Sequence, residues 1–169
     1  MKNKNLSFMT QAAMIAAIYV VLTYIFAPFS FGEVQVRISE ALTILPIFTP
    51  AAIPGLFVGC LIGNILGGAI LPDIVFGSIA TLIGAFFTWK LREQKPVVAT
   101  FPPIISNIII VPFVLRYGYG VTLPIPFMML TVGIGEVISC TILGLIVYGA
   151  LKKYKSTPVS YTHLTLPTI

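Results

Sequence analysis

The chain has 169 residues, of which 57% are hydrophobic and only 9% charged, and its mean hydropathy is +1.02. A soluble domain of this length needs far more charge to cover its surface, so the composition excludes that class and predicts an all-α integral membrane protein. The formal net charge of +5 is expected to reflect contact with membrane lipid of the anionic inner leaflet, with no nucleic acid as partner.

Five apolar runs follow one another along the chain, and most reach the roughly 20 residues that cross a bilayer core. They cover about 8–27, 41–71, 74–91, 97–115 and 125–151. The second run is ambiguous, because it can hold one long tilted helix or two short ones joined at Pro54 and Gly55.

The distribution of basic residues favours two helices in that run, which gives six spans. The cytoplasmic side then holds Lys2, Lys4, Lys90, Arg92, Lys95, Lys152, Lys153 and Lys155, against Arg37 and Arg116 outside. A single helix would invert the later loops and contradict the positive-inside rule. We therefore predict a six-transmembrane-helix bundle in the cell membrane, with both termini cytoplasmic. Its short, proline-rich second helix, over about 39–49, is expected to stay in the outer half.

Residues 1–155 are expected to form this membrane domain. Residues 156–169, STPVSYTHLTLPTI, are uncharged and rich in threonine, and they resemble translated cloning read-through. The only histidine, His163, lies in this tail. Cys60 and Cys140 fall inside predicted spans, where they are expected to be small packing residues, so we expect no metal site.

Small residues mark two faces where helices should approach closely in lipid. Gly55, Gly59, Gly63 and Gly67 recur at every fourth position and predict a contact within the bundle.

The first helix carries a second set of small residues, in TQAAMIAAIYVVL. Ala12 pairs with Ala16, and Ala13 pairs with Ala17. Spacing alone leaves open whether these pairs meet a helix of the same chain or an external partner.

Polar residues within spans are costly to bury and usually mark a site or a pathway. The candidates are Asn64, Asn107 and Glu136 within spans, Asp73 and Arg116 at outer helix ends, and Glu33, Arg37 and Glu40 in the stretch FGEVQVRISEAL. The predicted topology places all of them in the outward-facing half or slightly outward of the centre. They are therefore expected to line or cover a pocket that opens outward.

The stretch EVQVRI alternates polar and apolar residues, which predicts an extended segment with one polar face. Ser39 is expected to cap the following helix, with Glu40 in its first turn. The alternative is a solvated turn in which Arg37 pairs with Glu33 or Glu40.

The chain contains no G-x-x-x-x-G-K-[ST] nucleotide-binding motif, and outside the tail it contains no HExxH, G-x-S-x-G or Ser/His arrangement. We therefore expect no enzymatic activity, no catalytic residue and no cofactor in this chain.

Residues 1–155 resemble the queuosine-precursor transporter (QueT) family, which are substrate-binding S components of energy-coupling factor transporters. The resemblance lies in the six-helix layout, in AAMIAAIY, and in VRISEALTILPIF leading into PAAIPGLFVGCLIGNILGG. It implies a subunit that takes its ligand from outside and docks on a transmembrane coupling protein, driven by two cytoplasmic ATPase subunits that use ATP. It also implies that Ala12 and Ala16 contact the coupling protein.

The implied ligands are deazaguanine bases. Their N–H and amine donors suit the Glu136 carboxylate, and their carbonyl suits the Asn107 amide. The aminomethyl form is a cation, for which Glu40, Glu33 or Asp73 is a plausible second carboxylate partner. Tyr117 and Tyr119 can stack on the base or serve as interfacial anchors.

Three other functions stay open. The chain can be an autonomous proton-coupled transporter of a small polar molecule with Glu136 as the titrating group, an S component for another vitamin, or a structural membrane subunit that binds no ligand. The sequence does not distinguish the precursor base, its aminomethyl form and queuine.

Overall fold

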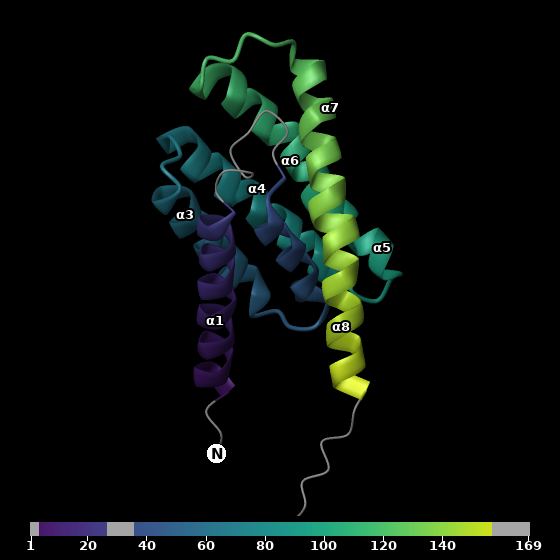
Figure 1. The fold of residues 1–169 in the computed structure, drawn as a ribbon. Helices are drawn as coiled ribbons and strands as arrows, with labels where there is room; N and C mark the ends of the chain where they lie inside the picture. Colours follow the sequence, from purple (N-terminus) through teal and green to yellow (C-terminus); the bar gives the residue numbers. More distant parts are fainter. Residues whose placement is uncertain (1–3, 27–35, 157–169) are drawn as a thin grey trace, which may run out of the picture.

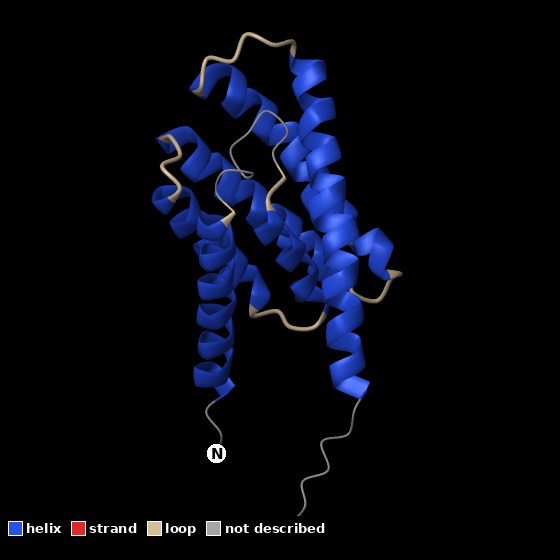
Figure 2. Ribbon diagram, viewed as in Figure 1, coloured by secondary structure: helices blue, strands red, loops and turns tan. Residues whose placement is uncertain are grey.

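The computed structural model describes residues 4–26 and 36–156, and the regular structure in these ranges is entirely helical (Figure 2). The described helices are α1 (Lys4–Ile25), η1 (Ile38–Ile47), α3 (Ala52–Leu66), α4 (Leu71–Lys90), α5 (Pro96–Ala99), α6 (Phe101–Phe113), η2 (Val114–Gly118), α7 (Ile125–Glu136), η3 (Val137–Leu143) and α8 (Gly144–Ser156). The all-α prediction is confirmed for this part of the chain. Glu33 and residues 157–169, which include His163, lie outside it.

Four described stretches are long and apolar enough to cross a membrane: Lys4–Ile25, Leu71–Lys90, Pro96–Gly118 and Ile125–Tyr154. They agree with four of the five apolar runs.

The fifth run, 41–71, divides into two shorter apolar helices, η1 and α3. The break falls at residues 48–51, earlier than expected. Pro54 lies in the first turn of α3, where its missing N–H would have no partner within the helix. It therefore does not interrupt α3.

Helix connections alternate between the two ends of the bundle (Figure 1). The start of α1 and the end of α8 lie at one end, with the η1–α3 and α4–α5 connections nearer to it, while the α3–α4 and α6–α7 connections lie toward the other. A chain that crosses the membrane six times would have this arrangement of connections. The number of spans and their orientation in the membrane stay predictions, because η1 and α3 are shorter than the four long stretches.

The second helix of the bundle, η1, is a ten-residue 3₁₀-helix with Pro46 inside it. A 3₁₀-helix rises about 2.0 Å per residue, so ten residues cover about 20 Å. One end lies beside Thr23, whose Oγ1 donates to Oγ of Ser39 at 2.8 Å, and the other lies beside Gln11, whose Oε1 accepts from Thr49 at 2.9 Å. η1 therefore runs alongside α1 from Thr23 to Gln11, and its expected place in the outer half of the membrane stays a prediction.

The start of η1 also differs from the prediction. Its N-cap residue is Arg37, which makes no capping hydrogen bond through its side chain. Ser39 lies one residue inside the helix and is completely buried, where it is bonded to Thr23. The contact with α1 thus replaces the expected capping role of Ser39.

The glycine stripe of α3 packs against α1. A Cβ atom on Gly55 would lie 2.7 Å from the carbonyl oxygen of Ala12, and one on Gly59 would lie 2.8 Å from Cβ of Tyr19. A Cβ on Gly63 would lie 3.3 Å from the side chain of Thr23. The predicted close contact within the bundle is confirmed, and α1 is the helix that packs against the glycine stripe.

This contact also involves Ala12 and Ala16, whose expected role is to meet the coupling protein. Ala16 is only 7% exposed, and its Cα would lie 3.1 Å from a Cβ on Gly59. The Ala12–Ala16 face therefore packs at least partly on α3, and its contact with an external partner stays a prediction. The second pair, Ala13 and Ala17, is exposed.

Candidate binding site

Glu40 is the most deeply buried charged side chain in the described residues, with no exposed surface. It projects from the first turn of η1. Its Oε1 accepts a 2.5 Å hydrogen bond from the Tyr19 hydroxyl on α1 and a 3.4 Å bond from the Thr81 hydroxyl on α4. Its Oε2 is buried without a hydrogen-bond partner. Oε1 of Glu40 is thus hydrogen-bonded within the protein, whereas Oε2 is available to another group.

Glu136 is the last residue of α7 and is 4% exposed. A π-helical segment, η3, follows at once, and such segments are rare and often occur at functional sites. Within η3, the Cys140 thiol donates to Oε2 of Glu136 at 3.2 Å. Asn107, 4% exposed on α6, lies within reach of a side-chain hydrogen bond to Glu136.

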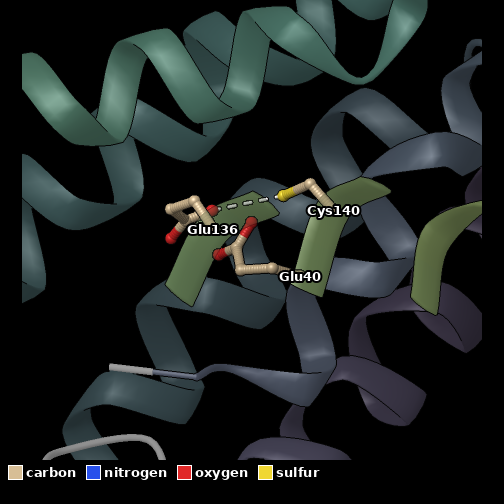
Figure 3. Close-up of side chains that lie close together, drawn as sticks. All are labelled: Glu40, Glu136 and Cys140. Atoms are coloured by element: carbon tan, nitrogen blue, oxygen red, sulfur yellow. Dashed lines mark hydrogen bonds between the residues drawn. The ribbon is translucent and has the colours of Figure 1, made fainter. Parts of the chain in front are cut away.

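The two carboxylates face each other across the interior of the bundle (Figure 3). One donor atom from each of Glu40, Glu136 and Cys140 lies within 4.8 Å of the others. This spacing is short enough for one small cation to contact all three. This cluster was not predicted from the sequence, because Cys140 was expected to be a packing residue and Glu40 was expected in the outward-facing half, apart from Glu136 near the centre.

A second polar group joins the start of η1 to the start of α4. Nη2 of Arg37 lies 3.6 Å from Oδ2 of Asp73, and both side chains are almost completely buried. The Tyr119 hydroxyl donates to the same Oδ2 at 3.0 Å, and Asn64 donates to the backbone oxygen of Asp73 at 3.4 Å. Asp73 therefore connects three segments that are distant in sequence.

Tyr119 lies beyond the membrane-length stretch that ends at Gly118. Partial burial, together with the negative charge of Asp73, raises the pKa of its hydroxyl above the usual value. The hydroxyl therefore stays protonated at neutral pH and continues to donate to Asp73.

The structure separates the remaining predicted site residues from these two groups. Arg116 is exposed and donates to the carbonyl oxygens of Val121 and Leu123. Tyr117 is 79% exposed and stacks on Phe113. Glu33 lies outside the described residues.

Sequence reasoning missed four residues of the buried cluster: Tyr19, Cys60, Thr81 and Cys140. Thr81 donates to Sγ of Cys60 at 3.4 Å as well as to Glu40. Only Cys140 carried a local signal, since it follows Glu136 by four residues, the spacing of side chains on one helix face.

The grooves on the outer surface have a different chemical character from the buried polar cluster. One of about 490 Å³ lies between α4 and α6 and is lined by residues such as Phe76, Ile109 and Phe113. Its lining is almost entirely apolar, which suits lipid tails and offers no hydrogen-bond partners to a polar ligand.

Membrane-length apolar helices that enclose buried carboxylates define a multi-pass membrane protein with an internal polar site. Residues 9–153 match the QueT transporter family, and the chain belongs to this family. The family consists of transporters and is not an enzyme family.

Over 84 residues, the chain is 33% identical to a protein named queuosine precursor transporter QueT from Lactococcus lactis subsp. cremoris (strain MG1363). The matched region covers 48% of this chain and 48% of that protein, so the likeness spans about half of each. No solved structure matches the chain.

Proposed function

We propose that this chain is the substrate-binding S component of an energy-coupling factor importer and captures a queuosine precursor, a 7-deazaguanine base, from outside the cell. Membership of the QueT transporter family and the name of the Lactococcus lactis protein support the ligand class. The sequence contains no Walker A motif, which suits a subunit whose transport is driven by partner ATPases.

The observation that carries this proposal is the burial of Glu136 beside Asn107 and opposite Glu40. A guanine-like edge presents a ring N–H next to an exocyclic amine, and one carboxylate accepts both. In the proposed complex Glu136 accepts these two bonds, and the Asn107 amide donates to the carbonyl of the base. The unpartnered Oε2 of Glu40 is the remaining acceptor near the site.

In this proposal, Asp73 and its partners form the outer boundary of the site. Arg37, Asp73 and Tyr119 belong to three different segments, toward the end of the bundle that holds the α3–α4 and α6–α7 connections. A ligand that enters from this end passes between these segments, so their contacts must loosen or shift as it binds.

The transmembrane coupling protein is proposed to dock on the exposed Ala13–Ala17 face of α1. The structure leaves this pair accessible, whereas the Ala12–Ala16 pair packs on α3. Small residues let a partner helix approach closely in lipid, where hydrophobicity gives little drive to association.

Calorimetry with purified protein and a 7-deazaguanine base tests the role of Glu136. Replacement of Glu136 by Gln removes one charged hydrogen bond. It also places the amide N–H group of Gln opposite an N–H group of the base, so that two donors face each other. This should cost about 2–4 kcal/mol, which is about 30- to 1,000-fold in affinity. Asn107→Ala should cost less, because it removes a neutral hydrogen bond. Glu93→Gln is the matched control, since the Glu93 side chain is 83% exposed.

If Glu136→Gln binds within about threefold of the parent protein, the ligand site lies elsewhere. Native mass spectrometry of the purified chain then identifies what it carries, which also separates this proposal from an S component for another vitamin.

A proton-coupled secondary transporter is the second candidate, because two buried carboxylates that face each other are a common feature of proton pathways. Reconstitution of the chain alone into proteoliposomes distinguishes the two. Uptake driven by a pH gradient without partner subunits supports the secondary transporter, and uptake only with the coupling protein, the ATPases and ATP supports the S component.

A further inference from the structure

The buried charges of the described residues do not balance. The buried charged side chains there are Arg37, Glu40, Asp73 and Glu136, one cation against three carboxylates. Arg37 lies 3.6 Å from Asp73, and neither Glu40 nor Glu136 belongs to an ion pair among the described residues. Two ionised carboxylates this close in a low-dielectric interior repel strongly, so the pair requires a positive charge of its own.

The groups around the pair do not supply this charge. Tyr19 from α1, Cys60 from α3 and Cys140 from η3 face the carboxylates, and all three are neutral at pH 7 in their ordinary protonation states. Asn107 from α6 and Thr81 from α4 are uncharged. Arg37 acts electrostatically on both carboxylates, but it also lies beside Asp73.

We infer that Glu40 and Glu136 form a cation subsite, which holds one shared proton when empty and exchanges it for the ammonium group of a cationic ligand. This inference rests on the proposed function and adds to it the chemical class of the preferred ligand and a linkage to protons. The proton leaves to bulk water as the ammonium enters, so the net charge of the buried pair and its cation is unchanged.

The geometry assigns different tasks to the two carboxylates. Oε1 of Glu40 is held by Tyr19 and Thr81, while Oε2 is free to bear the proton or to accept from an ammonium. Glu136 lies beside Asn107, and in this inference it is the carboxylate that accepts from the base edge in its ionised form. A neutral base therefore leaves the proton on Glu40, and a base with an aminomethyl group expels it.

The test is calorimetry of the full chain with two probes, 7-aminomethyl-7-deazaguanine and its uncharged analogue 7-methyl-7-deazaguanine. Each titration is run in phosphate and in Tris, whose ionisation enthalpies differ, so that the difference in heat reports protons released. We expect about one proton per bound aminomethyl ligand and none for the methyl analogue. Affinity for the aminomethyl ligand should rise with pH by up to about tenfold per unit, and affinity for the methyl analogue should stay nearly constant.

Glu40→Gln provides the matched variant, since its amide imitates the protonated carboxyl and keeps an acceptor for Tyr19. Thermal unfolding shows whether this variant is folded, and it should lose less affinity for the methyl analogue than for the aminomethyl ligand. Its affinity for the aminomethyl ligand should fall about 10- to 100-fold, and proton release should vanish. Glu93→Gln should change none of these values.

Several results would overturn the inference. Equal proton release with the two probes, or unchanged proton release in Glu40→Gln, would show that Glu40 does not exchange a proton for the ammonium group. Loss of binding after treatment with EDTA would show that the subsite holds a metal ion instead. If both probes bind but neither releases a proton, the cation subsite fails while the proposed function stands; if neither probe binds, both fail.

Discussion

Tyr19 on α1 donates a 2.5 Å hydrogen bond to Oε1 of Glu40 on η1, and both side chains are almost completely buried. The same tyrosine lies against Gly59 of α3, where any Cβ atom would lie 2.8 Å from that of Tyr19. One residue thus links the close contact between two helices to the orientation of a buried carboxylate. The absence of a side chain at Gly59 is what lets Tyr19 take this position.

Tyr19→Phe should destabilise the protein by about 1–3 kcal/mol, because it removes the hydroxyl and leaves Oε1 of Glu40 with only the longer bond from Thr81. Thermal unfolding of the purified protein in detergent measures the effect. Tyr24→Phe is the control, since Tyr24 is 66% exposed on the same helix and should change stability very little. Equal melting temperatures for both variants would show that the bond contributes nothing measurable.

Gly59→Ala should destabilise the α1–α3 contact by about 1–3 kcal/mol, because the added methyl group must displace Tyr19 or push the helices apart. Gly149→Ala on α8 is the matched control, since nothing lies within 4 Å of a Cβ there. The expected sign at Gly149 is opposite, because alanine favours the helix over glycine. If Gly59→Ala matches the parent protein in stability and ligand binding, the contact is looser than the structure indicates.

Replacement of Ala13 and Ala17 by Leu should prevent co-purification with the coupling protein and abolish transport. Ligand affinity of the isolated chain should change by less than about threefold, because both residues lie on the outer face of α1. Ala150→Leu tests a bulky residue at another exposed alanine, on α8, and should leave assembly intact. Recovery of a complete complex from the Ala13/Ala17 double variant would place the docking surface elsewhere.

Cysteine labelling of intact cells tests the predicted topology. Cys60 and Cys140 are buried, so they should give little background with a membrane-impermeant maleimide. A cysteine at exposed Gln94 should react only after the membrane is opened, and one at exposed Thr122, in the connection before α7, should react from outside. Labelling of the position 94 variant in intact cells would overturn the six-span arrangement.

The amino-acid sequence alone determined the helical class, the four long spans and the division of residues 41–71 into two short helices. These features follow from local composition. A membrane span is recognised by the length of its apolar run, and basic residues in a loop indicate the side of the membrane on which that loop lies. It also identified Glu136 and Asn107 as candidate ligand contacts and Gly59 and Gly63 as packing residues. A buried polar side chain and a small-residue stripe are both visible without knowledge of their partners.

Only the tertiary structure decided which groups meet. The sequence placed Glu40 near an outer loop with Arg37 as a possible partner, whereas the fold directs it toward Tyr19, Glu136 and Cys140 and pairs Arg37 with Asp73. It also showed that the Ala12–Ala16 pair packs on α3, whereas Ala13 and Ala17 are exposed. The physical reason is that pairing in a helix bundle depends on the rotation of each helix and on the identity of its neighbours. Several small-residue faces satisfy the same spacing in sequence, but only one arrangement packs them all at once.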